Sequence, residues 1–173
     1  MRTLFDHIYN SIKEINFDEN ELCKQYWFKL ERLKANFTDQ AALQMLFENI
    51  EWLINSDVVD SDIILSLGDE KKMNDAGIFF SGTTVEKDCK LILFKDAKTI
   101  VSGHSQVRCF DNSICESYDS SFITAFHNSQ VISKNSKVVV FGDSKVQSKG
   151  LCLIEDYSEG KAEIQSTKRD LVY

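Results

Sequence analysis

The chain of 173 residues lacks proline altogether, and it has only three histidines and five cysteines. No two cysteines form a CxxC pair, and no phosphate-binding loop, HExxH, GxSxG or zinc-ligand spacing occurs. These absences exclude the enzyme and metal-binding classes that such motifs define. No apolar run approaches the roughly 18 residues that a membrane-spanning helix needs. We therefore expect no catalytic residue, no cofactor, no bound metal and no membrane partner.

Basic clusters, with which nucleic-acid-binding proteins neutralise phosphates, are also missing. The net charge is −7: residues 1–77 hold 8 Lys and Arg against 15 Asp and Glu, whereas residues 78–173 hold 12 of each. All of the excess negative charge therefore lies in the N-terminal part. We expect no direct nucleic-acid binding. A protein partner is favoured instead, for instance a basic nucleoprotein effector.

What the sequence does contain is a repeat of eight residues over residues 89–150, with two units one residue short. In register the units read CKLILFKD, AKTIVSGH, SQVRCFDN, SICESYDS, SFITAFHN, SQVISKN, SKVVVFGD and SKVQSKG. The first position is always small, the third and fifth are compact or apolar, and the last two favour turns. A strand and a turn repeated at a fixed period indicate a β-solenoid, in which each coil is buried by stacking on its neighbours.

The sixth position indicates that two units complete one coil. It is phenylalanine in every odd unit (Phe94, Phe110, Phe126 and Phe141), whereas the even units carry serine, tyrosine or lysine. Residues 16 apart should therefore stack, and odd and even units should form separate sheets. We predict an α+β fold with a two-sided β-solenoid (β-helix) of about 16 residues per coil over residues 78–164. The octads supply about four coils, and residues 165–173 form a charged C-terminal tail.

The region 1–77 predicts amphipathic helices, because apolar residues recur at helical spacing. The first helix begins near Leu4. A second follows an Asp18 cap and uses Leu22 and Cys23, and a third begins after Thr38 or Asp39. Residues 63–67 form a short apolar element of uncertain type, and residues 69–75 form one or two helical turns. We expect this acidic region to cap the solenoid, whose end coil would otherwise expose unpaired backbone. An N-terminus without signal or transit character and reduced cysteines favour a cytoplasmic protein.

Two features are candidate partner-binding surfaces. One is the phenylalanine ladder, which strict alternation would expose; alternatively, the chain bends at the sixth position and the rings fill the narrow edge of the core. The other is the acidic face of the helices, which either mimics the phosphate array of a nucleic acid or is simply solvated. The candidate residues are Glu14, Glu21, Glu31, Glu48, Glu51, Phe94, Phe110, Phe126 and Phe141.

The octads SQVRCFDNS, SFITAFHNS and SKVVVFGDS resemble the β-solenoid repeats of small proteins of bacteria and their phages. The resemblance covers about a third of the chain. Some small acidic phage-borne proteins inhibit bacterial defence systems, among them anti-CRISPR proteins. The resemblance thus implies a non-catalytic inhibitor that binds a nucleic-acid-handling effector. We expect the chain to be a monomer or a homodimer. Two alternatives are a self-assembling structural solenoid, and an acyltransferase-like enzyme with a site between subunits that uses His104 and His127.

Overall fold

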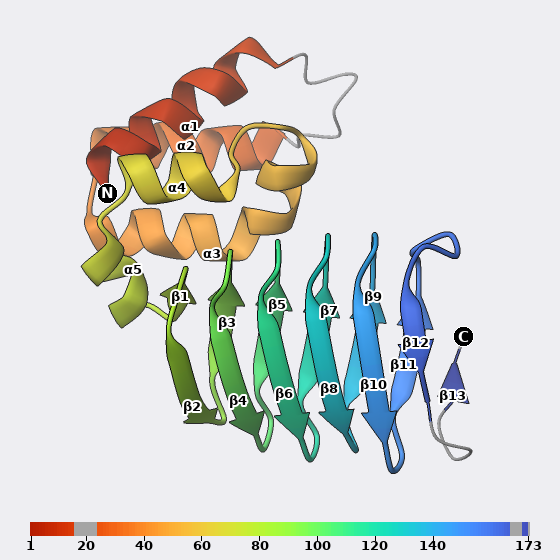
Figure 1. Ribbon diagram of the computed structural model, residues 1–173. Coiled ribbons are helices and arrows are strands. Elements are labelled where there is room, and N and C mark those ends of the chain that lie inside the picture. The colour runs from red at the N-terminus through yellow and green to blue at the C-terminus, as the bar shows by residue number, and fades with distance from the viewer. Residues whose placement is uncertain (16–23, 167–170, 173) are drawn as a thin grey trace. The chain divides into compact units, whose positions relative to one another are not determined.

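The computed structural model describes residues 1–15, 24–166 and 171–172, and the chain forms two compact units, Met1–Ala76 and Gly77–Tyr173. The first unit is helical and the second is a β-solenoid (Figure 1). The predicted cap Asp18 and the predicted helix residues Glu21, Leu22 and Cys23 lie outside the described residues.

In its described part the first unit contains five helices: α1 (Arg2–Glu14), α2 (Lys24–Ala35), α3 (Asp39–Asn55), α4 (Ser61–Leu67) and α5 (Glu70–Asp75). Thr38 caps α3 by accepting a hydrogen bond from the Ala41 amide at 3.2 Å. Asp60 and Asp69 cap α4 and α5 in the same way. These side-chain caps explain why helices as short as α4 and α5 begin where they do. The apolar element at residues 63–67 is therefore helical.

Aromatic and charged contacts hold the helices of this unit together. Tyr9 of α1 stacks on Trp27 of α2 with ring centroids 5.1 Å apart. The Tyr9 hydroxyl donates to Glu31 at 2.5 Å, and this hydrogen bond raises the pKa of Tyr9. Lys72 of α5 donates to Asp39 of α3 at 2.5 Å. Side chains distant in sequence thereby tie α1 to α2 and α3 to α5.

Within the described residues the solenoid has thirteen strands in two parallel sheets, a seven-stranded sheet of odd-numbered strands and a six-stranded sheet of even-numbered strands. Each coil runs up one sheet and down the other (Figure 1). The strands are β1 (Ile78–Phe79), β2 (Thr83–Lys87), β3 (Lys90–Leu93), β4 (Lys98–Ser102), β5 (Gln106–Cys109), β6 (Ile114–Tyr118), β7 (Phe122–Ala125), β8 (Gln130–Lys134), β9 (Lys137–Val140), β10 (Lys145–Lys149), β11 (Leu153–Asp156), β12 (Glu163–Gln165) and β13 (Leu171–Val172).

The register confirms the two-unit coil. Val107 pairs with Ile123, 16 residues away, while Gln130 pairs with Lys145, 15 away, because the sixth unit is one residue short. The solenoid is longer than the eight octads, however, with about six turns in place of the predicted four. Leu171 and Val172, which lie within the predicted tail 165–173, form β13 and pair with β11. A chain end can add a strand to an open sheet edge without any octad pattern.

The solenoid core is made by the third and fifth positions of the octads, as the alternation of side chains along a strand predicts. The first position is small because it is buried where the chain turns between the sheets. There the Ser105 hydroxyl donates to the Ser102 carbonyl at 2.7 Å, and Ser144 donates to Phe141 at 2.7 Å. At Ser105 and Ser144 the buried serine thus closes the turn and satisfies its own hydroxyl.

Candidate functional site

The phenylalanine ladder is a column of stacked rings, and most of it is buried. Phe94 and Phe110 are 1% exposed and Phe126 is 7% exposed. Neighbouring ring centroids lie 4.7 to 5.1 Å apart from Phe94 to Phe141. Phe80 and Tyr157 extend the column at its two ends. Of the two alternatives, an exposed aromatic stripe is therefore wrong for Phe94, Phe110 and Phe126, and a bend at the sixth position that turns the rings into the core describes them.

The burial of these rings follows from a tight turn that begins at the sixth position. The Phe110 carbonyl accepts a hydrogen bond from the Ser113 amide at 3.2 Å, and Asp111 between them has a φ of 56°. A left-handed residue immediately after the phenylalanine ends the strand and breaks its alternation. Sequence alternation alone could not place the ring, because the turn geometry decides its direction.

The two histidines of the enzyme alternative lie on turns at opposite edges of the solenoid. His104 follows the even-numbered strand β4, whereas His127 follows the odd-numbered strand β7 (Figure 1). His127 belongs to a ladder of turn contacts: its Nδ1 accepts from the Asp111 amide at 3.2 Å. Asp111 in turn accepts from the Lys95 amide at 3.0 Å. Within one chain the two imidazoles are not brought into one site.

The predicted acidic residues are not gathered into one cluster. Glu31 binds the Tyr9 hydroxyl, and Glu48 accepts a hydrogen bond from Gln44 at 2.8 Å. Glu14 is exposed near the end of α1, and Glu51 is half-buried on α3. Glu21 lies outside the described residues. Glu48 and Glu51 share α3, whereas Glu31 lies on α2 among basic residues.

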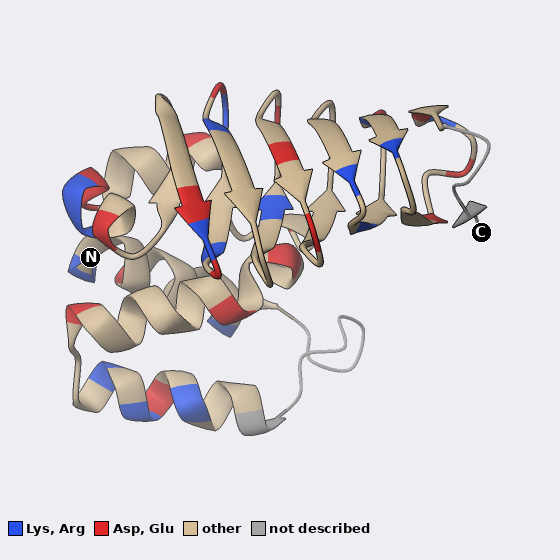
Figure 2. Ribbon diagram, turned by 90° about the horizontal axis from the view of Figure 1, so that it is seen from below, with Lys and Arg blue, Asp and Glu red and all other residues tan. Residues whose placement is uncertain are grey.

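The negative charge is more concentrated than this residue set implies. Residues 39–75, which we name the acidic segment, hold nine Asp and Glu against two Lys, and this equals the whole net charge of the chain. In the ribbon view α3 carries acidic positions only, whereas α2 carries mainly basic ones (Figure 2). Other acids of this segment, such as Asp57, Asp62 and Asp75, are exposed but were not among the predicted binding residues. The net charge of successive short windows of the sequence would have indicated them.

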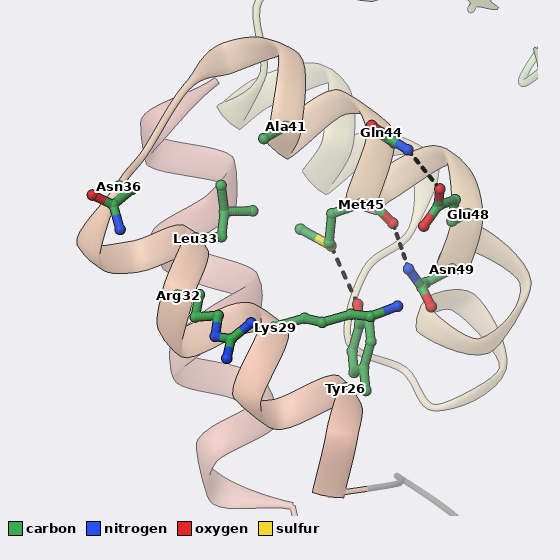
Figure 3. Close-up of a pocket in the computed structure, with 10 residues that line it drawn as sticks. All are labelled: Tyr26, Lys29, Arg32, Leu33, Asn36, Ala41, Gln44, Met45, Glu48 and Asn49. Atoms are coloured by element: carbon green, nitrogen blue, oxygen red, sulfur yellow. Dashed lines mark hydrogen bonds between the residues drawn. The ribbon is translucent and has the colours of Figure 1, made fainter.

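A pocket of about 370 Å³ lies between α2 and α3 (Figure 3). Lys29 and Arg32 line it from α2, and Gln44, Glu48 and Asn49 line it from α3. The Tyr26 hydroxyl donates to the Met45 sulfur at 3.2 Å. Burial, reinforced by Glu48, raises the pKa of Tyr26 well above its ordinary value, so the phenol stays neutral and is a poor general base. Among the described residues that line this pocket there is no histidine, cysteine or serine.

The buried cysteines are not poised for chemistry. Cys109 and Cys115 are fully buried, and both are free thiols. A hydrogen bond with Cys109, together with burial, raises the pKa of Cys115. The Cys115 thiolate, which would be the reactive form, is therefore strongly disfavoured. No group of three or more His, Cys, Asp or Glu within the described ranges could hold a metal ion.

No protein-family model matches this chain, and neither a curated protein nor a solved structure matches it significantly. Among the helices that the structure describes, none combines the length and the apolar character that crossing a membrane requires. The features that bear on function are therefore the acidic segment, the pocket between α2 and α3 and the phenylalanine ladder.

Proposed function

We propose that this chain is a non-catalytic inhibitor that binds a protein partner through the acidic segment. In its most specific form it is a cytoplasmic anti-defence protein of a phage or mobile element, comparable in role to an anti-CRISPR protein. Its partner is a nucleic-acid-handling effector with a basic groove. The inhibitor occupies that groove and keeps nucleic acid out.

One observation carries this proposal: the entire net charge of −7 lies on residues 39–75. The remainder of the chain is balanced, so the charge is a local property and not a general device for solubility. A local field of one sign steers an oppositely charged partner and can raise its association rate about 10- to 1,000-fold. Glu48, Glu70 and Asp75 are exposed and can face such a partner.

The alternative of a self-assembling solenoid is less well supported, because β2, which pairs only with β4 among the described strands, carries a charge where an apolar residue would be needed. Glu86 pairs in register with Val101, which is fully buried. Glu86 therefore occupies an inward position and would be trapped between coils if another solenoid stacked on β2. Inward-pointing charges of this kind prevent edge-to-edge association.

The experiment expresses the tagged chain in bacteria that carry an active CRISPR–Cas system and challenges them with a phage which that system targets. An inhibitor restores plaque formation, and the effector complex is recovered with the tag. The test variant reverses three charges of the acidic segment, Glu48→Lys, Glu51→Lys and Asp75→Lys. The matched control reverses three acids of the solenoid, Asp96→Lys, Asp143→Lys and Glu159→Lys.

We expect the segment variant to lose plaque restoration and effector recovery, and the solenoid variant to retain both. Recovery should weaken as salt rises from about 0.1 M, because ionic screening shortens the range of the charges. If the two variants behaved alike, the acidic segment would not be the binding surface. If the wild-type chain neither restored plaques nor recovered an effector, the anti-defence role would be wrong.

A further inference from the structure

The outer face of the six-stranded sheet exposes apolar side chains that the core does not use. Val85 is 73% exposed, Tyr118 38% and Ile132 37%. Ile100 and Ile114 are half-buried on the same face. The inward side of this sheet is already filled by its own buried residues, such as Val101, Cys115 and Val131. These five apolar side chains, which we name the apolar row, thus have no role in the solenoid core.

The register places the apolar row across four neighbouring strands, with Glu116 of β6 standing between Ile100 and Ile132. Val85 pairs with Ile100, Ile100 with Glu116, and Glu116 with Ile132. Ile114 and Tyr118 lie on either side of Glu116 in β6, and the Tyr118 hydroxyl donates to Glu116 at 3.3 Å. The row therefore runs perpendicular to the strands, along the axis of the solenoid. A recess of about 100 Å³ adjoins Ile132 at the end of the row.

Lysines border the apolar row on both sides. Lys98 and Lys145 lie on one side, and Lys87, Lys134 and Lys149 lie on the other. All five are exposed. On this face they outnumber the acids, which are Glu116 and Glu163, and Glu163 already pairs with Lys145 at 3.4 Å. Such a surface is complementary to a ligand whose apolar side chains are flanked on both sides by acidic residues.

The spacing of the row favours an α-helix as this ligand. Adjacent strands are about 4.8 Å apart, so the row from Val85 to Ile132 is about 14 Å long. A helix presents side chains of one face every three or four residues, which is about 4.5 to 6 Å along its axis. An extended segment presents same-face side chains about 6.6 Å apart, which fits less well. About ten helical residues match the length of the row.

We propose that the outer face of the six-stranded sheet docks an amphipathic α-helix of a partner protein, with an apolar stripe bordered by acidic residues. The apolar row receives the stripe, the recess beside Ile132 receives one terminal side chain, and the five lysines pair with the acidic borders. This surface lies on the solenoid and selects acidic partners, so it is distinct from the acidic segment, which selects basic ones. The two proposals can fail separately.

The experiment titrates the full chain with two synthetic helical peptides of about 12 residues. Both carry leucine at the same helical positions, and their borders are glutamate in one and lysine in the other. Binding is followed by fluorescence anisotropy at about 0.1 M salt and mapped by amide chemical shifts. The test variant is Val85→Asp with Ile132→Asp. The matched control, Leu151→Asp with Tyr157→Asp, changes two other exposed apolar residues of the solenoid, which are 68% and 59% exposed.

We expect the glutamate peptide to bind and to shift amides of β4, β6 and β8, and the lysine peptide to bind at least about tenfold more weakly. The test variant should lose about tenfold or more in affinity, and the control should lose less than about twofold. Charge reversal at Lys98→Glu with Lys134→Glu should invert the preference between the peptides. Since all the substituted side chains are exposed, retained circular dichroism will verify folding.

Several outcomes would overturn this assignment. Equal binding of both peptides would mean nonspecific apolar adhesion, and absence of binding by the glutamate peptide would exclude an acidic helix. An equal loss in the control variant would place the site elsewhere. If sedimentation showed a wild-type dimer that the test variant dissolves, the occupant of this face would be a second copy of the chain.

Discussion

At the scale of single residues, the solenoid depends on positions where the backbone takes a left-handed conformation. Gly103 has a φ of 69°, and its amide donates to Asp119 of the next coil at 3.4 Å. A Cβ atom at Gly103 would overlap the Asp88 carboxylate. Gly82 has a similar φ of 82°, but a Cβ there would meet nothing within 4 Å. Substitution of Gly82 therefore introduces backbone strain alone, whereas substitution of Gly103 introduces both backbone strain and steric overlap.

Gly103→Ala should destabilise the chain more than Gly82→Ala. An alanine with a left-handed backbone lowers the free energy of unfolding by about 1 to 2 kcal/mol, and this loss applies to both variants. Overlap with Asp88 adds to it only at Gly103, so a total loss of about 2 kcal/mol or more is expected there. Urea denaturation measures both losses. Adding Asp88→Ala to Gly103→Ala should recover part of the loss, and equal losses at the two glycines would contradict this explanation.

At the scale of elements, α5 is tied to α3 by charge. Lys72 donates to Asp39 at 2.5 Å and lies 3.6 Å from Asp69. The hydrogen bond from Lys72 lowers the pKa of Asp39, and the same bond raises the pKa of Lys72. The backbone amide of Lys72 lowers the pKa of Asp69. These groups are exposed, so the contribution to stability is modest and depends on salt.

The sign of the pH dependence follows from these shifts. Because the folded pKa of Asp39 lies below its ordinary value of 3.8, its stabilisation is present above that value and is lost as the pH falls through the lowered pKa. The stabilisation by Lys72 is present below 10.5 and is lost as the pH rises through the raised pKa. The ion pair between Asp39 and Lys72 should thus stabilise the folded chain at pH values between the lowered pKa of Asp39 and the raised pKa of Lys72.

Lys72→Met should therefore lower the urea midpoint at neutral pH, and the difference from wild type should shrink as the pH falls through the lowered pKa of Asp39. The neighbouring exposed residue provides a control, Lys71→Met, which should change the midpoint little at any pH. A difference between wild type and Lys72→Met that stayed constant from neutral to acidic pH would show that lost packing of the lysine stem, and not its charge, destabilises the variant.

At the scale of the whole molecule, a solenoid must stop growing at its ends. The edge strand β2 pairs only with β4 among the described strands, and four of its five residues are exposed. Glu86 occupies the inward position of this strand. An unpaired carboxylate buried between two coils would cost several kcal/mol. This single charge therefore opposes end-to-end stacking.

Glu86→Val should promote association of solenoids through β2, because valine would place an apolar side chain in the inward position next to Val101. Sedimentation velocity at micromolar concentration would detect the larger species. Glu86→Gln removes the charge but not the polarity, and we expect it to associate less. A valine variant with the same sedimentation coefficient as the wild-type chain would show that another feature limits stacking.

The repeat by itself determined the two-sheet solenoid, its 16-residue coil and its buried positions. It could do so because strand alternation and coil stacking are local and periodic: Val107 and Ile123 pair as their octad positions require. The short apolar element at residues 63–67 was ambiguous, because such a run fits a helix or a strand until a cap such as Asp60 is recognised.

Only the tertiary structure decided where side chains at the turns point and what adjoins what. The ring of Phe110 is buried because a left-handed Asp111 redirects the chain, whereas strand alternation by itself would turn the ring outward. The strand β13 lacks the octad pattern and is defined only by its pairing with β11. The apolar row likewise exists only in the register, since Val85, Ile100 and Ile132 lie 15 to 47 residues apart and reach one face of the sheet because parallel coils stack. The octad pattern thus determines the strands and the coil length, because these repeat along the sequence. The position of β13 and the composition of the apolar row depend on which strands pair in the folded chain.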